Sequence, residues 1–457
     1  MSVESGAAGE TFDAAVIGGG PGGSTVAARL AERGRRVVVL ERQRFPRFHI
    51  GESLLPSSFS VLRSLGLEEE LDRRFLRKYG ARFLDDAAPD LAAPIARARY
   101  CFSEAFPPAL PYAWQVSRDE FDDLLLRNAA RLGAEVREGW KVIEPIRTQG
   151  VVTGVVASDP AGVVHRLAAK VVVDATGRDG LLTRGEAGAR GHQRIAQLDR
   201  TAIFTHVHGG QRNPGIDEGQ IEIIILAGQD EDGGNPGWGW FIPFKDGRSS
   251  VGFVLSSSTL RRRVADARSL AGPGEGPSPR EYAARSTELA GRVAAVFDAE
   301  VARSPWMRQL IGDAPRVGEV RAAADYSFRV ETLCGDGWLA VGDACGFLDP
   351  LFSTGANLAI GGGDRAAAAI DEALRSGDVS APRFAGYARS VRAATDLFLG
   401  AVQSFYRGDL RELLFKPDQR APLRKTITSM LAGDVFHDEA TPPLWAGYFR
   451  ERFPARP

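Results

Sequence analysis

The sequence predicts a mixed α/β fold in which a parallel-sheet domain is combined with a second, largely antiparallel sheet and a helical C-terminal region. A glycine-rich turn between two apolar runs, within residues 12–41, predicts the first domain. Two later apolar runs that lead into an aspartate, near residues 171–174 and 338–343, predict further strands. From about residue 372 the pattern becomes helical and rich in aromatic side chains.

Length and composition limit the class of protein. The 457 residues suffice for two or three domains. The 57 basic and 58 acidic side chains give a net charge of −1, which argues against a partner such as nucleic acid or an acidic membrane. No apolar run approaches the ~20 residues that span a bilayer, and residues 1–10 carry no secretion signal. Three cysteines without a Cys-x-x-Cys pair favour neither disulfides nor a metal site, so we expect a cytoplasmic globular protein without a metal.

The first forty residues have the pattern of a dinucleotide-binding unit: strand, glycine turn, helix, strand and acid. Gly18 permits the tight turn, Gly20 allows a pyrophosphate to approach the backbone, and Gly23 allows the helix and strand to pack closely. The helix N-terminus offers free N–H groups to the phosphates. Glu41, eighteen residues after Gly23, is placed to accept hydrogen bonds from ribose hydroxyls.

Two later segments resemble FAD domains of the glutathione-reductase type. Residues 171–180 (VVVDATGRDG) resemble the strand and turn before the return crossover of those domains, and residues 338–344 (WLAVGDA) resemble their final strand. The resemblance implies FAD, with Asp343 on the ribityl chain. It also implies a discontinuous FAD-binding domain formed by residues 10–84, 114–184 and 331–371, an inserted substrate domain formed by residues 85–113 and 185–330, and a C-terminal helical region formed by residues 372–457.

Four further segments resemble flavin-dependent halogenases. They are residues 42–56, which end in IGESLLP, Lys78 within KYGARF, GWGWFIP at 237–243, and DPLFSTGA at 349–356. The third reproduces the Trp-x-Trp-x-Ile-Pro motif of that family. On this combination the sequence is identified as a member of the FADH2-dependent halogenases, and it is more similar to the phenol and pyrrole branch than to the tryptophan branch.

The resemblance implies a chemistry and a set of residues. In the family, reduced flavin and O2 form a C4a-hydroperoxide that oxidises chloride or bromide to hypohalous acid. The halide is then expected at the backbone N–H groups of Thr354 and Gly355, because successive amides in a tight turn form an anion nest. Trp238, Trp240 and Pro243 are expected to line the tunnel that guides the hypohalous acid, and the spacing of the two tryptophans places both on one face of a strand.

Lys78 is expected to be the catalytic residue at the end of this tunnel. An amine donates a hydrogen bond to hypohalous acid or, once burial has deprotonated it, forms a chloramine, whereas a guanidinium does neither comparably. Only six of the 57 basic residues are lysines. Taken without its motif, Lys78 is more simply interpreted as a solvated cation at a helix end.

The remaining implied contacts are with the cofactor, and Arg118 is expected to open a helix and to contact the pyrophosphate. The cofactor-binding set is Gly18, Gly20, Pro21, Gly23, Ser24, Glu41, Arg42, Ser53, Arg118, Asp343, Pro350, Gly355 and Ala356. A separate flavin reductase is expected as a partner, because no second glycine fingerprint for NAD(P)H is present. The substrate is expected to be an electron-rich aromatic such as a phenol or pyrrole, free or tethered to an acyl carrier protein, and the base that removes its proton is not assigned.

Two other flavoenzyme classes compete with this interpretation. Asp179-Gly180 followed by Arg184 resembles the Asp-Gly motif of FAD-dependent aromatic hydroxylases. Residues 238–243 are also close to the aromatic motif of geranylgeranyl-reductase-like enzymes. His206 and His208 lie two apart, which suggests either a metal site or two polar residues on one face of a strand.

Overall fold

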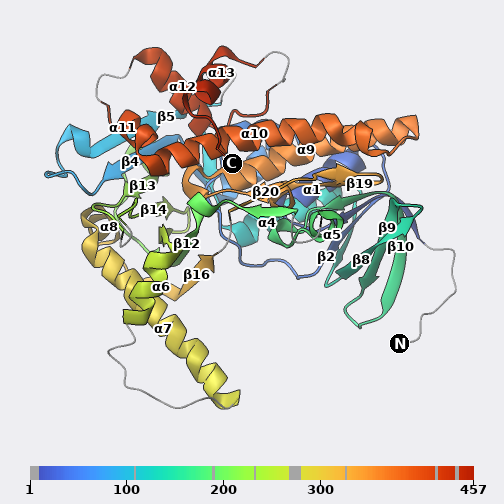
Figure 1. The fold of residues 1–457 in the computed structure, drawn as a ribbon, viewed down its shortest axis with the longest axis horizontal. Coiled ribbons are helices and arrows are strands. Elements are labelled where there is room, and N and C mark those ends of the chain that lie inside the picture. The colour runs from blue at the N-terminus through green and yellow to red at the C-terminus, as the bar shows by residue number, and fades with distance from the viewer. Residues whose placement is uncertain are drawn as a thin grey trace.

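The computed structural model describes residues 10–107, 110–187, 191–230, 233–266, 279–324, 327–416, 420–437 and 442–456. Three layers organise these residues: a first sheet with its helices, a second sheet, and a set of C-terminal helices that covers both (Figure 1). Of the described helices, none is long and apolar enough to cross a membrane.

The first sheet has eight strands and a parallel centre. Its order is β18-β19-β10-β1-β2-β7, and β9 and β8 extend it as antiparallel strands from β10. The strands β1, β10 and β19 come from three distant parts of the chain and lie side by side in parallel, which confirms the α/β fold expected from the sequence. The strands are β1 (Thr11–Ile17), β2 (Val37–Glu41), β7 (Glu135–Glu138), β8 (Lys141–Thr148), β9 (Val151–Ser158), β10 (Val164–Asp174), β18 (Cys334–Gly335) and β19 (Trp338–Ala340).

Helices pack against this sheet because its central strands are apolar on both faces. Helix α1 (Pro21–Glu32) packs between α4 (Arg118–Arg131) and α9 (Thr354–Ser376). Helix α4 starts at Arg118, as the sequence predicted. Smaller helices in this part of the chain are α2 (Phe59–Ser64), α3 (Glu68–Arg74) and α5 (Leu181–Ala187).

The second sheet has seven strands in the order β16-β12-β15-β14-β13-β4-β5, all antiparallel except the β13–β4 pair. The strands are β4 (Gly80–Asp85), β5 (Arg97–Cys101), β12 (Arg200–His208), β13 (Ile221–Ile225), β14 (Trp238–Pro243), β15 (Arg248–Ser256) and β16 (Arg316–Ala324). The sequence assigned residues 80–84 to the FAD-binding domain. In the structure they lie in the second sheet, because β4 forms backbone ladders with β13 and β5.

Two apolar clusters cover the two faces of the second sheet. One face packs against α6 (Ser257–Asp266), α7 (Pro279–Arg303) and α8 (Pro305–Ile311). The other face packs against α10 (Ala381–Arg407), α11 (Asp409–Leu414), α12 (Ala421–Leu431) and α13 (Leu444–Arg452). Most aromatic side chains near the C-terminus therefore form core on this second face, among them Phe398, Phe405, Trp445 and Phe449, whereas Tyr448 is exposed.

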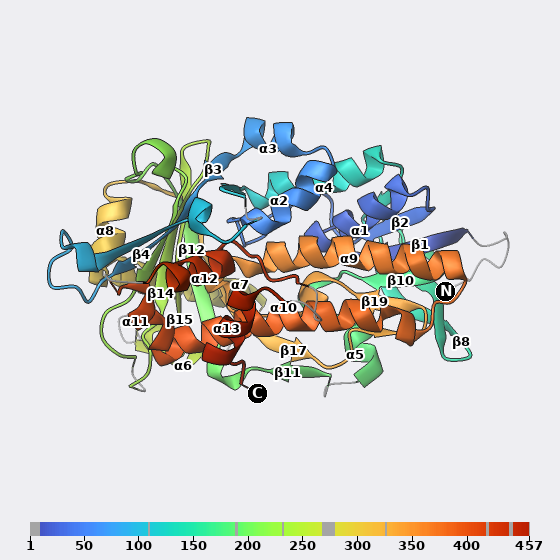
Figure 2. The same ribbon diagram turned by 90° about the horizontal axis from the view of Figure 1, so that it is seen from above.

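Helices α9 and α10 connect the two sheets. They lie side by side along the length of the molecule, from the second sheet to the far end of the first (Figure 2). Two small sheets lie between the large ones: β3 (Leu76–Lys78) with β6 (Ala113–Gln115), and β11 (His192–Arg194) with β17 (Phe328–Val330) and β20 (Gly346–Phe347). We call this region between the two large sheets the junction. Lys78 lies at the end of β3, and the 349–356 segment follows shortly after β20.

Candidate active site

The turn between β1 and α1 fits a pyrophosphate. Gly18 has φ of 105°, and a Cβ added there would lie 2.3 Å from the carbonyl oxygen of Ala175. A Cβ added to Gly23 would lie 2.0 Å from the carbonyl oxygen of Gly18, so neither position accepts a side chain. Gly20 caps α1 without a side-chain hydrogen bond and Pro21 opens the helix, which leaves the first N–H groups of α1 available to an anion.

Three further residues of the expected cofactor set lie near this turn in different roles. Glu41 is buried at the end of β2, and its Oε2 accepts a hydrogen bond from the N–H of Gly19 at 2.7 Å. The hydroxyl of Ser24 donates to the carbonyl of Gly19 at 2.8 Å, so it braces the turn from inside. Arg42 is exposed and forms an ion pair with Asp179 at 2.5 Å. The structure therefore brings Glu41 and Ser24 to the turn and leaves Arg42 at the surface.

A buried ionic cluster lies beside the same turn. Arg118 binds both carboxylate oxygens of Asp122, at 2.7 and 3.0 Å, and Arg47 binds Asp122 at 2.9 Å. Burial opposes ionisation of Asp122, but the two arginines lower its pKa below the ordinary value. The guanidinium of Arg47 lies 3.6 Å from where a Cβ of Gly20 would stand. Arg47 was not among the predicted cofactor residues, and its only signal in the sequence was its place within residues 42–56.

Lys78 is buried and lies on strand β3, which excludes a solvated helix end. Its side chain is 1% exposed, and its Nζ donates to the Ser53 hydroxyl at 2.7 Å and to the Leu54 carbonyl at 2.9 Å. The ring centroid of Phe102 lies 5.3 Å from the same nitrogen. Burial lowers the pKa of Lys78 from 10.5 to about 7, so near neutral pH a large fraction of this amine is unprotonated.

Glu52 and His206 form a polar pair that the sequence did not reveal. Glu52 is 3% exposed, and its Oε1 lies 2.8 Å from the Nε2 of His206 on β12. Its other oxygen, Oε2, is buried and has no hydrogen-bond partner among the described residues. Both side chains line a cavity together with Phe48, Arg118 and residues of β12, β15 and β16. His206 is thus a partner of Glu52, and no group of three potential metal ligands occurs in the part of the chain that the structure describes.

The segment expected to bind halide is a tight turn that leads into α9. The carboxylate of Asp349 accepts a hydrogen bond from the N–H of Leu351 at 3.0 Å, and Pro350–Phe352 form a single 3₁₀ turn. Ser353 has φ of 57°, a left-handed conformation that reverses the chain before α9 begins at Thr354. Thr354 and Gly355 therefore occupy the first two positions of a long helix, where backbone N–H groups have no partner within the helix.

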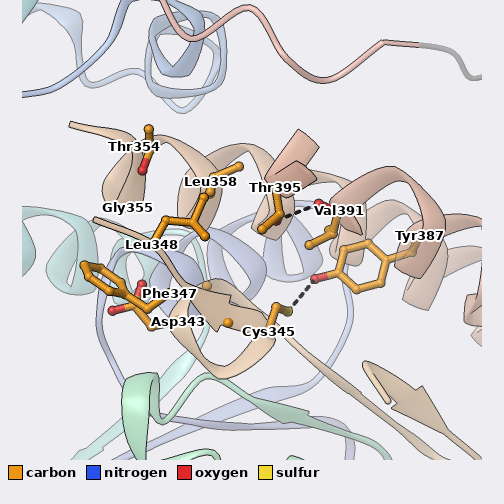
Figure 3. A pocket seen from close by; sticks show the side chains of 12 residues that line it. Asp343, Cys345, Phe347, Leu348, Thr354, Gly355, Leu358, Tyr387, Val391 and Thr395 are labelled. Atoms are coloured by element: carbon orange, nitrogen blue, oxygen red, sulfur yellow. Dashed lines mark hydrogen bonds between the residues drawn. The ribbon is translucent and has the colours of Figure 1, made fainter. Parts of the chain in front are cut away.

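Asp343 lies next to this turn. It borders a pocket together with Thr354 and Gly355, and its Oδ1 is 3.9 Å from where a Cβ of Gly355 would stand (Figure 3). Burial raises the pKa of Asp343 from 3.8 to about 6. The far side of the pocket is closed by Tyr387 of α10, whose hydroxyl lies 3.9 Å from the sulfur of Cys345.

The two tryptophans of β14 lie on one face of the strand, as their spacing predicted. Their ring centroids are 5.7 Å apart, and the indole N–H of Trp240 donates to the Ser250 hydroxyl at 3.0 Å. One apolar cluster contains Trp238, Trp240, Phe352 and Phe102, whose ring lies beside Lys78. Phe352 belongs to the turn at 349–353, called the halide turn below because halide is expected to bind where it leads into α9. The cluster thus includes a side chain of this turn and a ring beside the lysine.

The residues present fit FAD. The turn between β1 and α1 accepts only backbone at Gly18 and Gly23. The carboxylate expected at the ribose, Glu41, is buried, and the one expected at the ribityl chain, Asp343, borders the pocket beside Thr354. The orphaned Oε2 of Glu52 offers an additional acceptor. These features define a Rossmann-type dinucleotide-binding protein with a second sheet against the binding edge.

Comparison with known proteins identifies the family. The model of the tryptophan halogenase family matches residues 13–88 and 87–413, so the chain belongs to this family of flavin-dependent halogenases. The chain is 32% identical over 379 residues to a 1H-pyrrole-2-carbonyl-[peptidyl-carrier protein] brominase of Pseudoalteromonas luteoviolacea, covering 82% of this chain and 81% of that protein. It is 33% identical over 399 residues to a flavin-dependent halogenase of Armillaria mellea, covering 86% and 74%.

Solved structures agree with this assignment. The flavin-dependent brominase Bmp2 superimposes with a TM-score of 0.78 at 27% identity, covering 96% of this chain and 98% of that one. The myxobacterial chondrochloren halogenase CndH superimposes with a TM-score of 0.72 at 29% identity, covering 97% of each chain. The chain is therefore an enzyme of the oxidoreductase type whose family implies FAD and a halide.

Proposed function

We propose that this enzyme chlorinates or brominates an electron-rich aromatic compound and that Lys78 is its catalytic residue. The observation that carries the proposal is the state of the Lys78 amine: it is buried, borders the apolar cluster that contains both tryptophans, and has a pKa of about 7. A solvated lysine would remain fully protonated at neutral pH and would have no access to a water-poor site.

Each group in the junction has a part in this proposal. Reduced FAD, when bound, would supply two electrons that activate O2, and O2 would be the oxidant that converts halide to hypohalous acid with release of water. The N–H groups of Thr354 and Gly355 bind the halide before that step. Trp238 and Trp240 exclude water from the path, which prevents loss of the reactive halogen to solvent.

Lys78 receives the halogen at the end of the path. Its neutral amine attacks the halogen of hypohalous acid, so that an N–halogen bond forms and the halogen–oxygen bond breaks. The displaced hydroxide takes up a proton from the amine and leaves as water. The aromatic carbon then attacks the halogen, the N–halogen bond breaks with its electron pair returning to nitrogen, and the arene loses a proton. The sum is replacement of an aromatic hydrogen by halogen with release of water.

The relatives favour one class of substrate. Both the brominase of Pseudoalteromonas luteoviolacea and a 27% identical chlorinase of Pseudomonas fluorescens act, by their names, on a pyrrole-2-carbonyl group held by a peptidyl carrier protein. We propose the same class of carrier-tethered pyrrole for this enzyme, with a separate flavin reductase as the source of reduced FAD.

The test is incubation of the enzyme with FAD, a flavin reductase, NADH, O2 and bromide or chloride, followed by mass spectrometry. Pyrrole-2-carbonyl on a peptidyl carrier protein is compared with free pyrroles and phenols. Lys78→Met is expected to lose halogenation while it still binds FAD, and Lys141→Met, which changes an exposed lysine, is the matched control. Products that carry only hydroxyl groups would instead support an aromatic hydroxylase, and reduced alkenes would support a geranylgeranyl-reductase-like enzyme.

A further inference from the structure

One hydroxyl group on α10 joins the halide turn to the tryptophan pair. Tyr406 donates a hydrogen bond from its hydroxyl to the Oδ2 of Asp349 at 2.7 Å. The same hydroxyl accepts a hydrogen bond from the indole N–H of Trp238 at 3.0 Å. Tyr406 lies in the C-terminal helical region, some 50 residues from the turn and almost 170 from the tryptophan in sequence.

Asp349 is the internal brace of the halide turn. It is fully buried, and while its Oδ2 accepts from Tyr406, its Oδ1 accepts from the N–H of Leu351. The turn is closed by a further bond from the N–H of Ser353 to the carbonyl of Pro350 at 2.9 Å. The next residue, Thr354, begins α9 and supplies one of the N–H groups proposed to bind halide. The position of these N–H groups therefore depends on the position of the Asp349 carboxylate.

The ring of Tyr406 is itself held in place. The guanidinium of Arg200, on β12, lies 4.2 Å from the ring centroid and donates to the carbonyl of Asn235 at 3.0 Å. Phe405 packs its ring against Phe352 of the halide turn, with centroids 6.4 Å apart. Helix α10 thus contacts the turn with both an apolar ring and a hydrogen-bonding hydroxyl.

We propose that Tyr406 is a positioning residue for halogenation: its hydroxyl fixes the halide turn through Asp349 and the tunnel wall through Trp238, in a single geometry. The proposal rests on the function proposed above. A hydrogen bond to a buried carboxylate is charge-assisted, and its loss removes the Tyr406 donor from the Oδ2 of Asp349. The turn then relaxes, the N–H groups of Thr354 and Gly355 lose their alignment, and the indole N–H of Trp238 loses its acceptor on Tyr406.

Tyr406→Phe removes the hydroxyl and keeps the ring. We expect about a ten-fold rise in the KM for bromide, since a hydrogen bond to a charged group corresponds to at least a factor of ten in an equilibrium constant. We also expect more of the O2 consumed to appear as hydrogen peroxide and less as brominated product, because bound halide is scarcer and the tunnel wall is looser. Tyr448→Phe, on the exposed side of α13, is the matched control and should change neither quantity.

A second readout does not depend on turnover. Crystals of the FAD-loaded wild type and of Tyr406→Phe are soaked in bromide, and the anomalous peak beside the N–H groups of Thr354 and Gly355 is compared. The peak is expected in the wild type and is expected to be weaker in the variant. Trp238→Phe, which removes the indole N–H and leaves the Tyr406–Asp349 bond, should raise peroxide release while the bromide peak persists.

The outcomes separate the two proposals. A wild-type enzyme that neither halogenates nor binds bromide at the turn would overturn the proposed function and this inference with it. A wild-type enzyme that halogenates, together with a Tyr406→Phe variant of equal bromide KM, equal peroxide release and equal anomalous peak, would overturn the inference alone. A variant that merely loses thermal stability, with unchanged bromide KM and product-to-peroxide ratio, would show a packing role and would equally overturn it.

Discussion

Replacing Lys78 by methionine should change the pH dependence of stability in a direction fixed by burial. The pKa of Lys78 falls from 10.5 to about 7 in the folded protein. At 1.36 kcal/mol per pKa unit, this corresponds to about 5 kcal/mol against burying the ammonium form. Methionine has similar length and no charge, so Lys78→Met removes this cost together with the pH-independent hydrogen bonds to Ser53 and Leu54.

The sign follows from proton binding. Between pH 7 and 10.5 the unfolded chain keeps the proton on Lys78 and the folded chain has released it. The unfolded state then binds more protons, so the free energy of unfolding of the wild type rises with pH in this window. The difference in free energy of unfolding between the wild type and Lys78→Met should therefore rise by up to about 1.4 kcal/mol per pH unit between pH 7 and 10.5, and should not change with pH below or above this range.

Urea unfolding of both proteins with bound FAD, in steps of about one unit from pH 7 to 10, measures this difference. The pH-independent terms cancel from the slope, so packing changes caused by methionine do not affect the result. Parallel curves over the whole window would refute the placement of Lys78 in a desolvated site.

The lowered pKa of Lys78 also predicts how halogenation depends on pH. If the neutral amine accepts the halogen, halogenation should fall as the pH drops below about 7, while consumption of O2 continues. An activity that instead rises below pH 7 would indicate that the ammonium form acts by hydrogen bonding and not as a nucleophile.

Three other variants or conditions test the rest of the site. Gly23→Ala should abolish FAD binding, because its Cβ would stand 2.0 Å from a backbone oxygen. Gly291→Ala, in an open position on α7, is the control and should bind FAD normally. The FAD absorbance of each protein after gel filtration measures the bound cofactor. Asp343→Asn should stabilise the protein before FAD is bound. Burial raises the pKa of Asp343 to about 6, so the wild type loses stability as the pH rises from 3.8 through 6 and the carboxylate ionises. The Asp343→Asn variant should nevertheless bind FAD at least ten-fold more weakly, as measured by fluorescence titration. Bromide should replace chloride in turnover, because a site made of backbone N–H groups selects weakly by size; strict dependence on chloride in a halide-exchange assay would contradict a backbone nest.

Local sequence patterns were sufficient to predict features that depend mainly on a single short segment. The turn from Gly18 to Gly23 was predictable because Gly18 has a positive φ and Gly23 packs against the carbonyl of Gly18, and both requirements arise within one strand-turn-helix segment. The shared face of Trp238 and Trp240 was predictable because side chains alternate along any strand. The boundary at residue 80 was not, because strand β4 is assigned to its sheet by ladders with β13 and β5, and β13 lies about 140 residues away.

The sequence by itself determined the sheet class and the FAD fingerprint, and it singled out Lys78. Each strand, turn or motif behind these predictions is a short segment whose own residues are close together along the chain. Only the tertiary structure decided that Lys78 is desolvated, that Arg47 stands beside the phosphate turn, that Glu52 faces His206, and that Tyr406 joins Asp349 to Trp238. The physical reason is that burial and pairing are properties of the surroundings. Solvent exclusion and hydrogen-bond partners come from segments that the fold brings together, and no local spacing of residues encodes them.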